Sequence, residues 1–202
     1  KYVSVERFIS YFYQIDLLST AAASSGKKAL EIGVGNGTVA DYLKKAGLEL
    51  TTCDIDQELG PDVVADVRRL PFPDRSFDVV SACEILEHIP FEDFEPALAE
   101  LARVSRSYVL ISLPYHSTGI EVVLKTPLMR TIFGRAFLDL FLRIPLIFRR
   151  AGPSGQHFWE VDFFNYPLRR IRTVLAKHFI IEREVRPVLQ SFHYFFLLRP
   201  RR

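Results

Sequence analysis

The chain has 202 residues, of which 49% are hydrophobic and 25% are charged. These values predict one compact domain over residues 1–202 and exclude a disordered or fibrous protein. A net charge of +2 lacks the strongly basic field of sequence-independent nucleic-acid binding, so no nucleic-acid partner is expected. The only cysteines, Cys53 and Cys83, exclude a disulfide framework and make a cytoplasmic protein the default expectation. No apolar run approaches the roughly 18 residues of a membrane span.

The first half of the chain alternates helical and extended patterns. Residues 2–18 predict an amphipathic helix with one apolar face, formed by Val5, Phe8, Ile9, Phe12 and Ile15. Short apolar segments predict strands at 29–32, 50–53, 63–65, 77–81 and 108–112. Helical patterns at 38–45 and 94–103 would supply crossovers, whereas residues 57–62 are too few for one and predict a turn. This order is typical of a parallel α/β sheet.

The second half of the chain departs from this alternation. Extended runs at 179–185 and 192–198 predict an antiparallel pair that closes the sheet. Before them, an insertion is expected at about 115–160. Its residues 119–150 carry six basic and two acidic residues, and apolar residues from 129 to 144 repeat at helical spacing. Three roles are open for this predicted helix: packing on its own domain, a lid over an apolar substrate, or peripheral membrane contact.

A glycine turn carries the strongest chemical signal. Gly33, Gly35 and Gly37 follow the first predicted strand and open a helix. Glycines let the backbone approach a ligand closely, and the helix N-terminus presents free N–H groups. Asp54 follows Gly33 by 21 residues, at the end of the next predicted strand, where a carboxylate can accept both hydroxyls of a ribose. The combination predicts a site for an adenosine-containing cofactor.

The spacing of the turn distinguishes between such cofactors. Thr38 stands where the dinucleotide fingerprint G-x-G-x-x-G requires its third glycine, which disfavours a nicotinamide dehydrogenase. Asp66 ends the third predicted strand, and the sequences LPF, FDVV and EILEHI follow within residues 70–89. With these motifs, residues 29–114 resemble the class I S-adenosylmethionine-dependent methyltransferases, in particular their small-molecule group.

The resemblance implies a Rossmann-like, doubly wound sheet of seven mostly parallel strands, with an antiparallel C-terminal strand and a helical insertion after strand five. It implies S-adenosylmethionine as cofactor and S-adenosylhomocysteine as product. A methyl group would pass by direct in-line displacement to a small-molecule or lipid-like acceptor. A non-catalytic cofactor-binding or scaffold protein is the alternative, because fold does not guarantee activity.

The resemblance also implies roles for the residues that match the family's motifs. The glycines would wrap the methionine end of the cofactor, braced by Glu31, while Asp54 would hold the ribose. Ile55 would pack on adenine, and Asp66 with Val67 would read its amino edge. Glu84 would lie beside the methionine part or the acceptor. The expected cofactor-binding residues are thus Glu31, Gly33, Gly35, Gly37, Asp54, Ile55, Asp66, Val67 and Glu84.

Candidates for the acceptor side come from two further stretches of the chain. His88 is interpreted as a general base or as a residue that orients its loop, and Glu84 is the second catalytic candidate. Residues 155–160 combine polar and aromatic side chains, with Trp159 either in the core or near the substrate. The remaining histidines of this half, such as His157 and His193, have no compact ligand spacing, so no metal site is predicted.

Overall fold

Seven strands form one sheet in the order β3-β2-β1-β4-β5-β9-β8. The computed structural model describes residues 4–116, 119–134, 137–143, 155–163 and 165–202. Neighbouring strands from β3 to β5 are parallel, and β9 is antiparallel to both β5 and β8. The strands are β1 (Lys28–Ile32), β2 (Glu49–Asp54), β3 (Val63–Val64), β4 (Phe77–Cys83), β5 (Ser105–Pro114), β8 (Phe179–Val185) and β9 (His193–Pro200). The prediction of a seven-stranded, mostly parallel sheet is confirmed.

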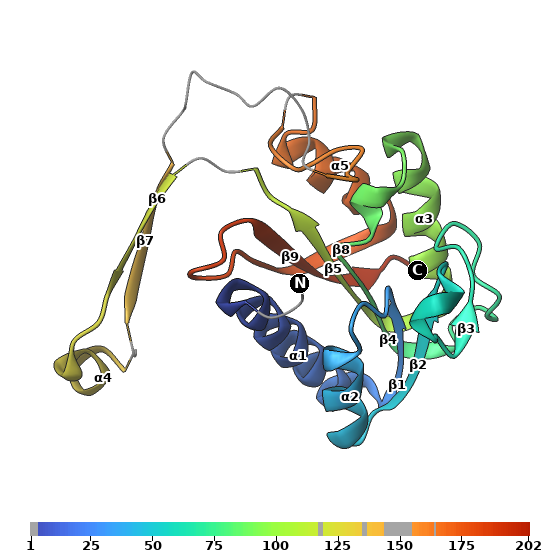
Figure 1. Cartoon of the computed structure of the whole chain (residues 1–202), viewed down its shortest axis with the longest axis horizontal. Helices are drawn as coiled ribbons and strands as arrows, with labels where there is room; N and C mark the ends of the chain where they lie inside the picture. Colours follow the sequence, from blue (N-terminus) through green and yellow to red (C-terminus); the bar gives the residue numbers. More distant parts are fainter. Residues whose placement is uncertain (1–3, 117–118, 135–136, 144–154, 164) are drawn as a thin grey trace.

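Helices cover both faces of this sheet. On one face lie α1 (Val5–Ser25) and α2 (Thr38–Lys45), and on the other lie α3 (Phe91–Val104) and α5 (Leu168–His178), as Figure 1 shows. Each face has its own cluster of buried apolar residues. The link between β2 and β3 is only a short 3₁₀ helix (Gln57–Leu59), so the predicted turn is confirmed. Among the described residues, none of the helices has both the length and the apolar character that crossing a membrane requires.

The apolar face predicted for α1 is wrong in its first half. Val5, Phe8 and Phe12 are exposed, whereas the polar residues Ser10 and Gln14 are buried. The expected pattern applies to a helix that packs on an apolar core, but this half of α1 lines a cavity instead, and mostly polar side chains of α1 face it. Its second half packs on the sheet through Leu17, Leu18, Ala21 and Ala22, which the predicted face did not include, and Ile15 of that face is partly buried against them.

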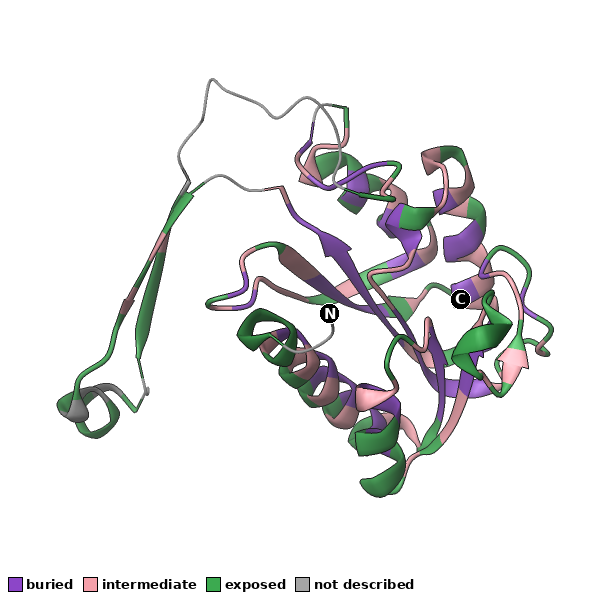
Figure 2. Cartoon of the chain, viewed as in Figure 1, coloured by how far each residue is buried: buried purple, intermediate pink, exposed green. Residues whose placement is uncertain are grey.

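The prediction of a helix within residues 119–150 is also wrong for most of the residues that the structure describes there, 119–134 and 137–143. Strands β6 (Gly119–Leu124) and β7 (Leu138–Arg143) form an antiparallel hairpin, and only α4 (Pro127–Phe133) at its tip is helical. Apolar residues at 138, 140 and 142 fit an alternating pattern as well as a helical one, so periodicity alone misassigns them. The hairpin projects from the domain, and most of its described residues are exposed (Figures 1 and 2). A helix packed on its own domain is therefore excluded for these residues, and 144–154 lie outside the described residues.

Candidate functional site

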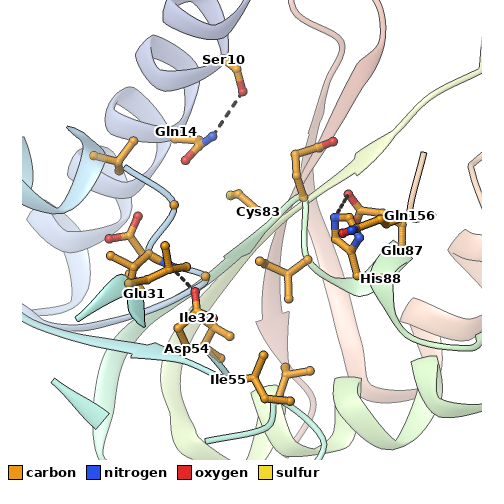
Figure 3. A pocket seen from close by; sticks show the side chains of 18 of the residues that line it. Ser10, Gln14, Glu31, Ile32, Asp54, Ile55, Cys83, Glu87, His88 and Gln156 are labelled. Atoms are coloured by element: carbon orange, nitrogen blue, oxygen red, sulfur yellow. Dashed lines mark hydrogen bonds and ion pairs between the residues drawn. The ribbon is translucent and has the colours of Figure 1, made fainter. Parts of the chain in front are cut away.

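A cavity of about 1160 Å³ lies where the parallel strands end. The carboxyl ends of β1, β2 and β4 lead into its walls, as expected for ligand sites of doubly wound sheets. The first half of α1 and residues 156–158 contribute the remaining walls, together with Gln190 and His193. Figure 3 shows Glu31 and Asp54 on one side of this cavity, and Glu87 and His88 on the opposite side.

The glycine turn is held in a shape that other residues rarely adopt. Gly33, Gly35 and Gly37 have φ angles of +87°, +55° and +74°. A Cβ atom on Gly33 would collide with the side chain of Ile85, because the loop after β4 passes directly against the turn. At Gly35 no other atom lies within 4 Å of the position a Cβ would take. The turn therefore combines a fixed backbone with free space beside Gly35 that a ligand can approach.

Asp54 fixes this turn as well as facing the cavity. Its Oδ2 accepts a hydrogen bond from the backbone N–H of Val34 at 2.9 Å, and its Oδ1 accepts one from the N–H of Asp56 at 3.0 Å. A carboxylate has about four acceptor positions, so both oxygens keep capacity for a ligand. The bond to the turn was not foreseen in the sequence, where Asp54 was assigned only to a ribose.

Glu31 lies nearby at the end of β1 and is only 7% exposed. Burial raises the pKa of this carboxyl from 4.5 to about 8, with Lys44 opposing the shift and Asp41 adding to it. Its Oε2 is buried and has no hydrogen-bond partner among the described residues. Such an oxygen is costly unless a ligand satisfies it, so Glu31 marks a second polar position on the wall of the cavity.

The residues expected around adenine also meet at the cavity. Ile55 is exposed at its rim, and Val67 is buried. Asp66 is engaged by Arg68, whose Nε lies 3.0 Å from each carboxylate oxygen, and these hydrogen bonds lower the pKa of Asp66. Arg68 also contacts Asp93 at 2.7 Å. Arg68 is a cavity residue that the sequence motifs do not reveal.

Glu84 stands in a strained position directly after β4. Its φ of +54° is uncommon for a residue with a side chain. Ser112 on β5 donates its hydroxyl to Glu84 Oε1 at 2.7 Å, and His193 Nε2 on β9 lies 3.5 Å from Oε2. His193 Nδ1 is in turn 2.9 Å from the hydroxyl of Ser10 on α1. Glu84 is thus held by β5 and β9, and α1 supports the β9 contact through His193; the sequence indicated none of these contacts.

Beyond Glu84, Glu87 and two histidines form a second polar group. Glu87 is fully buried, and its Oε1 lies 4.0 Å from Nε2 of His88 and 4.0 Å from Nε2 of His157. The two imidazole rings pack edge to face with centroids 5.0 Å apart. Burial, then the neighbouring carboxylates of Glu84 and Glu160, raises the pKa of Glu87 well above its usual range. Burial and His157 lower the pKa of His88.

Residues 155–163 are fixed against this group by backbone and side-chain contacts. The N–H of Phe158 donates to the Glu87 carbonyl at 2.9 Å, and Trp159 Nε1 donates to the Ile89 carbonyl at 3.1 Å. Trp159 is fully buried against Phe91 and Phe94. Of the two alternatives for Trp159, the core position is therefore correct, whereas the neighbouring Phe158 lies exposed at the cavity rim.

Comparisons with known proteins agree with this architecture. Residues 30–111 match a family model described as a methyltransferase domain. The chain is 33% identical over 142 residues to a demethylmenaquinone methyltransferase from Corynebacterium glutamicum (strain R), covering 66% of this chain and 57% of the relative. Over residues 30–111 the chain is thus similar to the methyltransferase family that its sequence motifs indicated. The predicted resemblance and the predicted seven-stranded, mostly parallel sheet are confirmed.

One further relative is similar in sequence, and one solved structure is similar in fold. A fatty-acid O-methyltransferase from Mycolicibacterium smegmatis is 35% identical over 111 residues, covering 46% of this chain and 40% of that protein. The crystal structure of magnesium protoporphyrin IX methyltransferase from Synechocystis PCC 6803 with bound SAH has a TM-score of 0.62 and covers 98% of this chain and 89% of that chain. At 16% identity it shows the shared fold alone. The chain spans about half the length of the curated relatives it matches.

Proposed function

We propose that this chain binds S-adenosylmethionine in the cavity and transfers its methyl group to a small-molecule or lipid-like acceptor. The observation that carries the proposal is the glycine turn held by Asp54, with open space beside Gly35 at the carboxyl ends of adjacent strands. Asp54 would hold the ribose, and Ile55 and Val67 would enclose adenine. Arg68 would have to share Asp66 with the adenine amino group.

The charge of the cavity supports a cationic cofactor. Acidic side chains outnumber basic ones in its lining, which contains Glu6, Glu31, Asp54, Asp66, Glu84 and Glu87 but only Arg7 and Arg68. S-adenosylmethionine carries a sulfonium and an ammonium group, and binding of these cations would favour the ionised forms of Glu31 and Glu87, whose pKa values burial raises. The unsatisfied Oε2 of Glu31, beside the turn that would wrap the methionine end, is one acceptor that such a group can use.

The reaction requires little of the protein beyond positioning. When bound, the sulfonium supplies an already activated methyl group. A lone pair of the acceptor forms the new bond to the methyl carbon as the sulfur–carbon bond breaks, the sulfur keeps the electron pair, and the acceptor's proton leaves. The chain would orient the acceptor and exclude water, tasks for which Glu84 and His88 lie at the correct end of the cavity.

The proposal is tested by direct binding and turnover. We expect S-adenosylmethionine to bind with one-to-one stoichiometry in calorimetry, and labelled methyl from it to appear on some member of a panel of quinols, phenols and fatty acids. The panel follows from the relatives, which are named for demethylmenaquinone and fatty acids. Binding without transfer to any panel member would favour the non-catalytic alternative, and absence of binding would overturn both.

We further propose that the hairpin β6–β7 brings the domain to a membrane surface, from which a lipid-like acceptor is taken. Its apolar side chains Leu124, Leu128, Ile132 and Leu140 are more than half exposed, and Lys125 and Arg130 lie among them in the chain. Exposed apolar groups with interspersed cations suit an anionic lipid surface. The hairpin also joins the cavity side of the domain, since Glu121 accepts a hydrogen bond from the N–H of Leu189 at 2.8 Å.

Vesicle binding distinguishes this role from a lid. The chain should co-sediment with vesicles of anionic lipid, and added salt should weaken this binding because the cation–lipid attraction is screened. Leu128→Asp and Ile132→Asp should abolish it, whereas Ile180→Asp, on the exposed surface of β8, should not. Binding that survives both tip substitutions would contradict the proposal. The expectation of a cytoplasmic location stays a prediction that rests on the free thiols of Cys53 and Cys83.

A further inference from the structure

Glu87, His88 and His157 form a donor set of which the methyl-transfer proposal uses only His88, and that only to orient the acceptor. One ligand atom from each of these residues lies within 4.8 Å of the other two. Two imidazole nitrogens and one carboxylate oxygen are ligands that zinc and similar divalent metals prefer, typically with a fourth position open to water or substrate. His88 and His157 are 69 residues apart in the chain, so their proximity could not be read from local spacing.

Glu87 is the observation that points to a missing partner. Its side chain is 0% exposed, and neither carboxylate oxygen has a hydrogen-bond partner among the described residues. A buried carboxylate without partners costs free energy, and proteins normally pair such a group or bind a metal with it. Oε1 lies 4.0 Å from an imidazole nitrogen of each histidine, where an ion would satisfy it. Other carboxylates nearby, including Glu84 and Glu160, make a cation still more favourable at this point.

The orientation of His157 supports the same conclusion. Its Nδ1 lies 2.9 Å from Oε1 of Glu160, while its Nε2 is directed to Glu87. A carboxylate that accepts the N–H of one imidazole nitrogen leaves the other nitrogen as a lone-pair donor, which is the arrangement commonly found behind metal-bound histidines. Glu160 is buried and is also 3.5 Å from Nδ1 of His116. His157 is thus prepared to act as a ligand.

We propose that Glu87, His88 and His157 form a binding site for a divalent transition metal ion, of which Zn²⁺ is the probe used below. Bonds to zinc are about 2 Å long, so two ligand atoms of a tetrahedral site lie about 3.3 Å apart. Both histidines would therefore have to move closer to Glu87 than their present 4.0 Å, and neither side chain is fully enclosed, with 41% of His88 and 21% of His157 exposed. The remaining position would open to the cavity, which all three residues line.

At that position the ion would bind an oxygen of the acceptor and make its hydroxyl easier to deprotonate. This role in the reaction rests on the proposed function, whereas metal binding itself does not. The two are separated by measuring S-adenosylmethionine binding on protein freed of metal with a chelator. A chain that binds Zn²⁺ but not S-adenosylmethionine would retain this site and lose the proposed function.

The full chain, freed of metal, should bind one Zn²⁺ in calorimetry, and Co²⁺ at the same site should give the absorption bands of a low-coordinate nitrogen and oxygen site. Glu87→Gln and His157→Ala should each lower the Zn²⁺ affinity more than about 100-fold, and Glu160→Gln about 10-fold, because supporting carboxylates matter less than ligands. His178→Asn is the matched control, since His178 pairs with Glu95 on distant helices and should leave the affinity unchanged.

Thermal unfolding supplies a second measurement of Zn²⁺ binding, independent of calorimetry. Zn²⁺ should raise the melting temperature of the wild-type chain by mass action, and this rise should be absent in Glu87→Gln. Without metal, Glu87→Gln should be at least as stable as wild type, because it removes an unpaired buried carboxylate. If Glu87→Gln does not fold, two other measurements test the metal site: the Zn²⁺ affinity of His157→Ala, which changes a less buried residue, and the Co²⁺ spectrum of the wild type. No stoichiometric Zn²⁺ binding, or unchanged affinity in the folded ligand variants, would overturn the proposal.

Discussion

Replacing Asp54 with alanine should lower the affinity for S-adenosylmethionine about 100-fold while the sheet stays folded. Ribose hydroxyls donate hydrogen bonds to a carboxylate, each contributing about 1.5–3 kcal/mol, so the loss of two costs at least about 3 kcal/mol and 100-fold is the lower end of the expected effect. The substitution also frees the N–H groups of Val34 and Asp56, which Asp54 holds at 2.9 and 3.0 Å, so the glycine turn loses its fixed shape. Calorimetry on the purified variant measures the loss.

Asp56→Ala is the matched control for this experiment. Asp56 lies two residues further along the same loop and caps the 3₁₀ helix by accepting the N–H of Glu58 at 2.9 Å, but it does not line the cavity. The Asp56→Ala variant should bind S-adenosylmethionine nearly as tightly as the wild type. Wild-type affinity in a folded Asp54→Ala variant would remove the ribose assignment, and an equal loss in both variants would indicate general damage to the loop.

Sequence patterns predicted correctly those parts of the fold that depend on residues close together in the chain. Strands β1, β2 and β4 are short apolar runs, and the glycine turn follows the first of them directly. Parallel strands end at one edge of a sheet, so Gly33 and Asp54 had to meet there once the strands were assigned. Neither step requires knowledge of contacts that are distant in the chain.

The predictions that were wrong depend on what each segment packs against. Phe8 and Phe12 have the spacing of a buried helix face, but that half of α1 covers the cavity with Ser10 and Gln14 instead. In the hairpin, apolar residues are exposed on both strands, so no buried face distinguishes its alternating pattern from a helical one. The proximity of Glu87 to His157 likewise depends on a tertiary contact, made when Phe158 bonds to the loop after β4.

Glu31 should give the stability of the chain a distinct pH dependence. Its pKa is about 8 in the folded chain, because of burial, against 4.5 for an exposed glutamate. Between these two values the folded state holds a proton that the unfolded state has lost. The free energy of unfolding therefore falls as pH rises from about 4.5 to about 8, by at most about 1.4 kcal/mol per pH unit from this group, and is constant above that range.

Glu31→Gln isolates this contribution, because glutamine keeps the size of the side chain and does not titrate. Urea unfolding of both proteins at several pH values should show the variant gaining stability relative to wild type as pH rises from 5 to 8, with little further change above 8. The comparison cancels the contributions of all other titratable groups, since both proteins contain them. A difference between the two that does not vary with pH would mean that Glu31 is ionised in the folded chain, which would also remove it as the unsatisfied carboxyl beside the glycine turn.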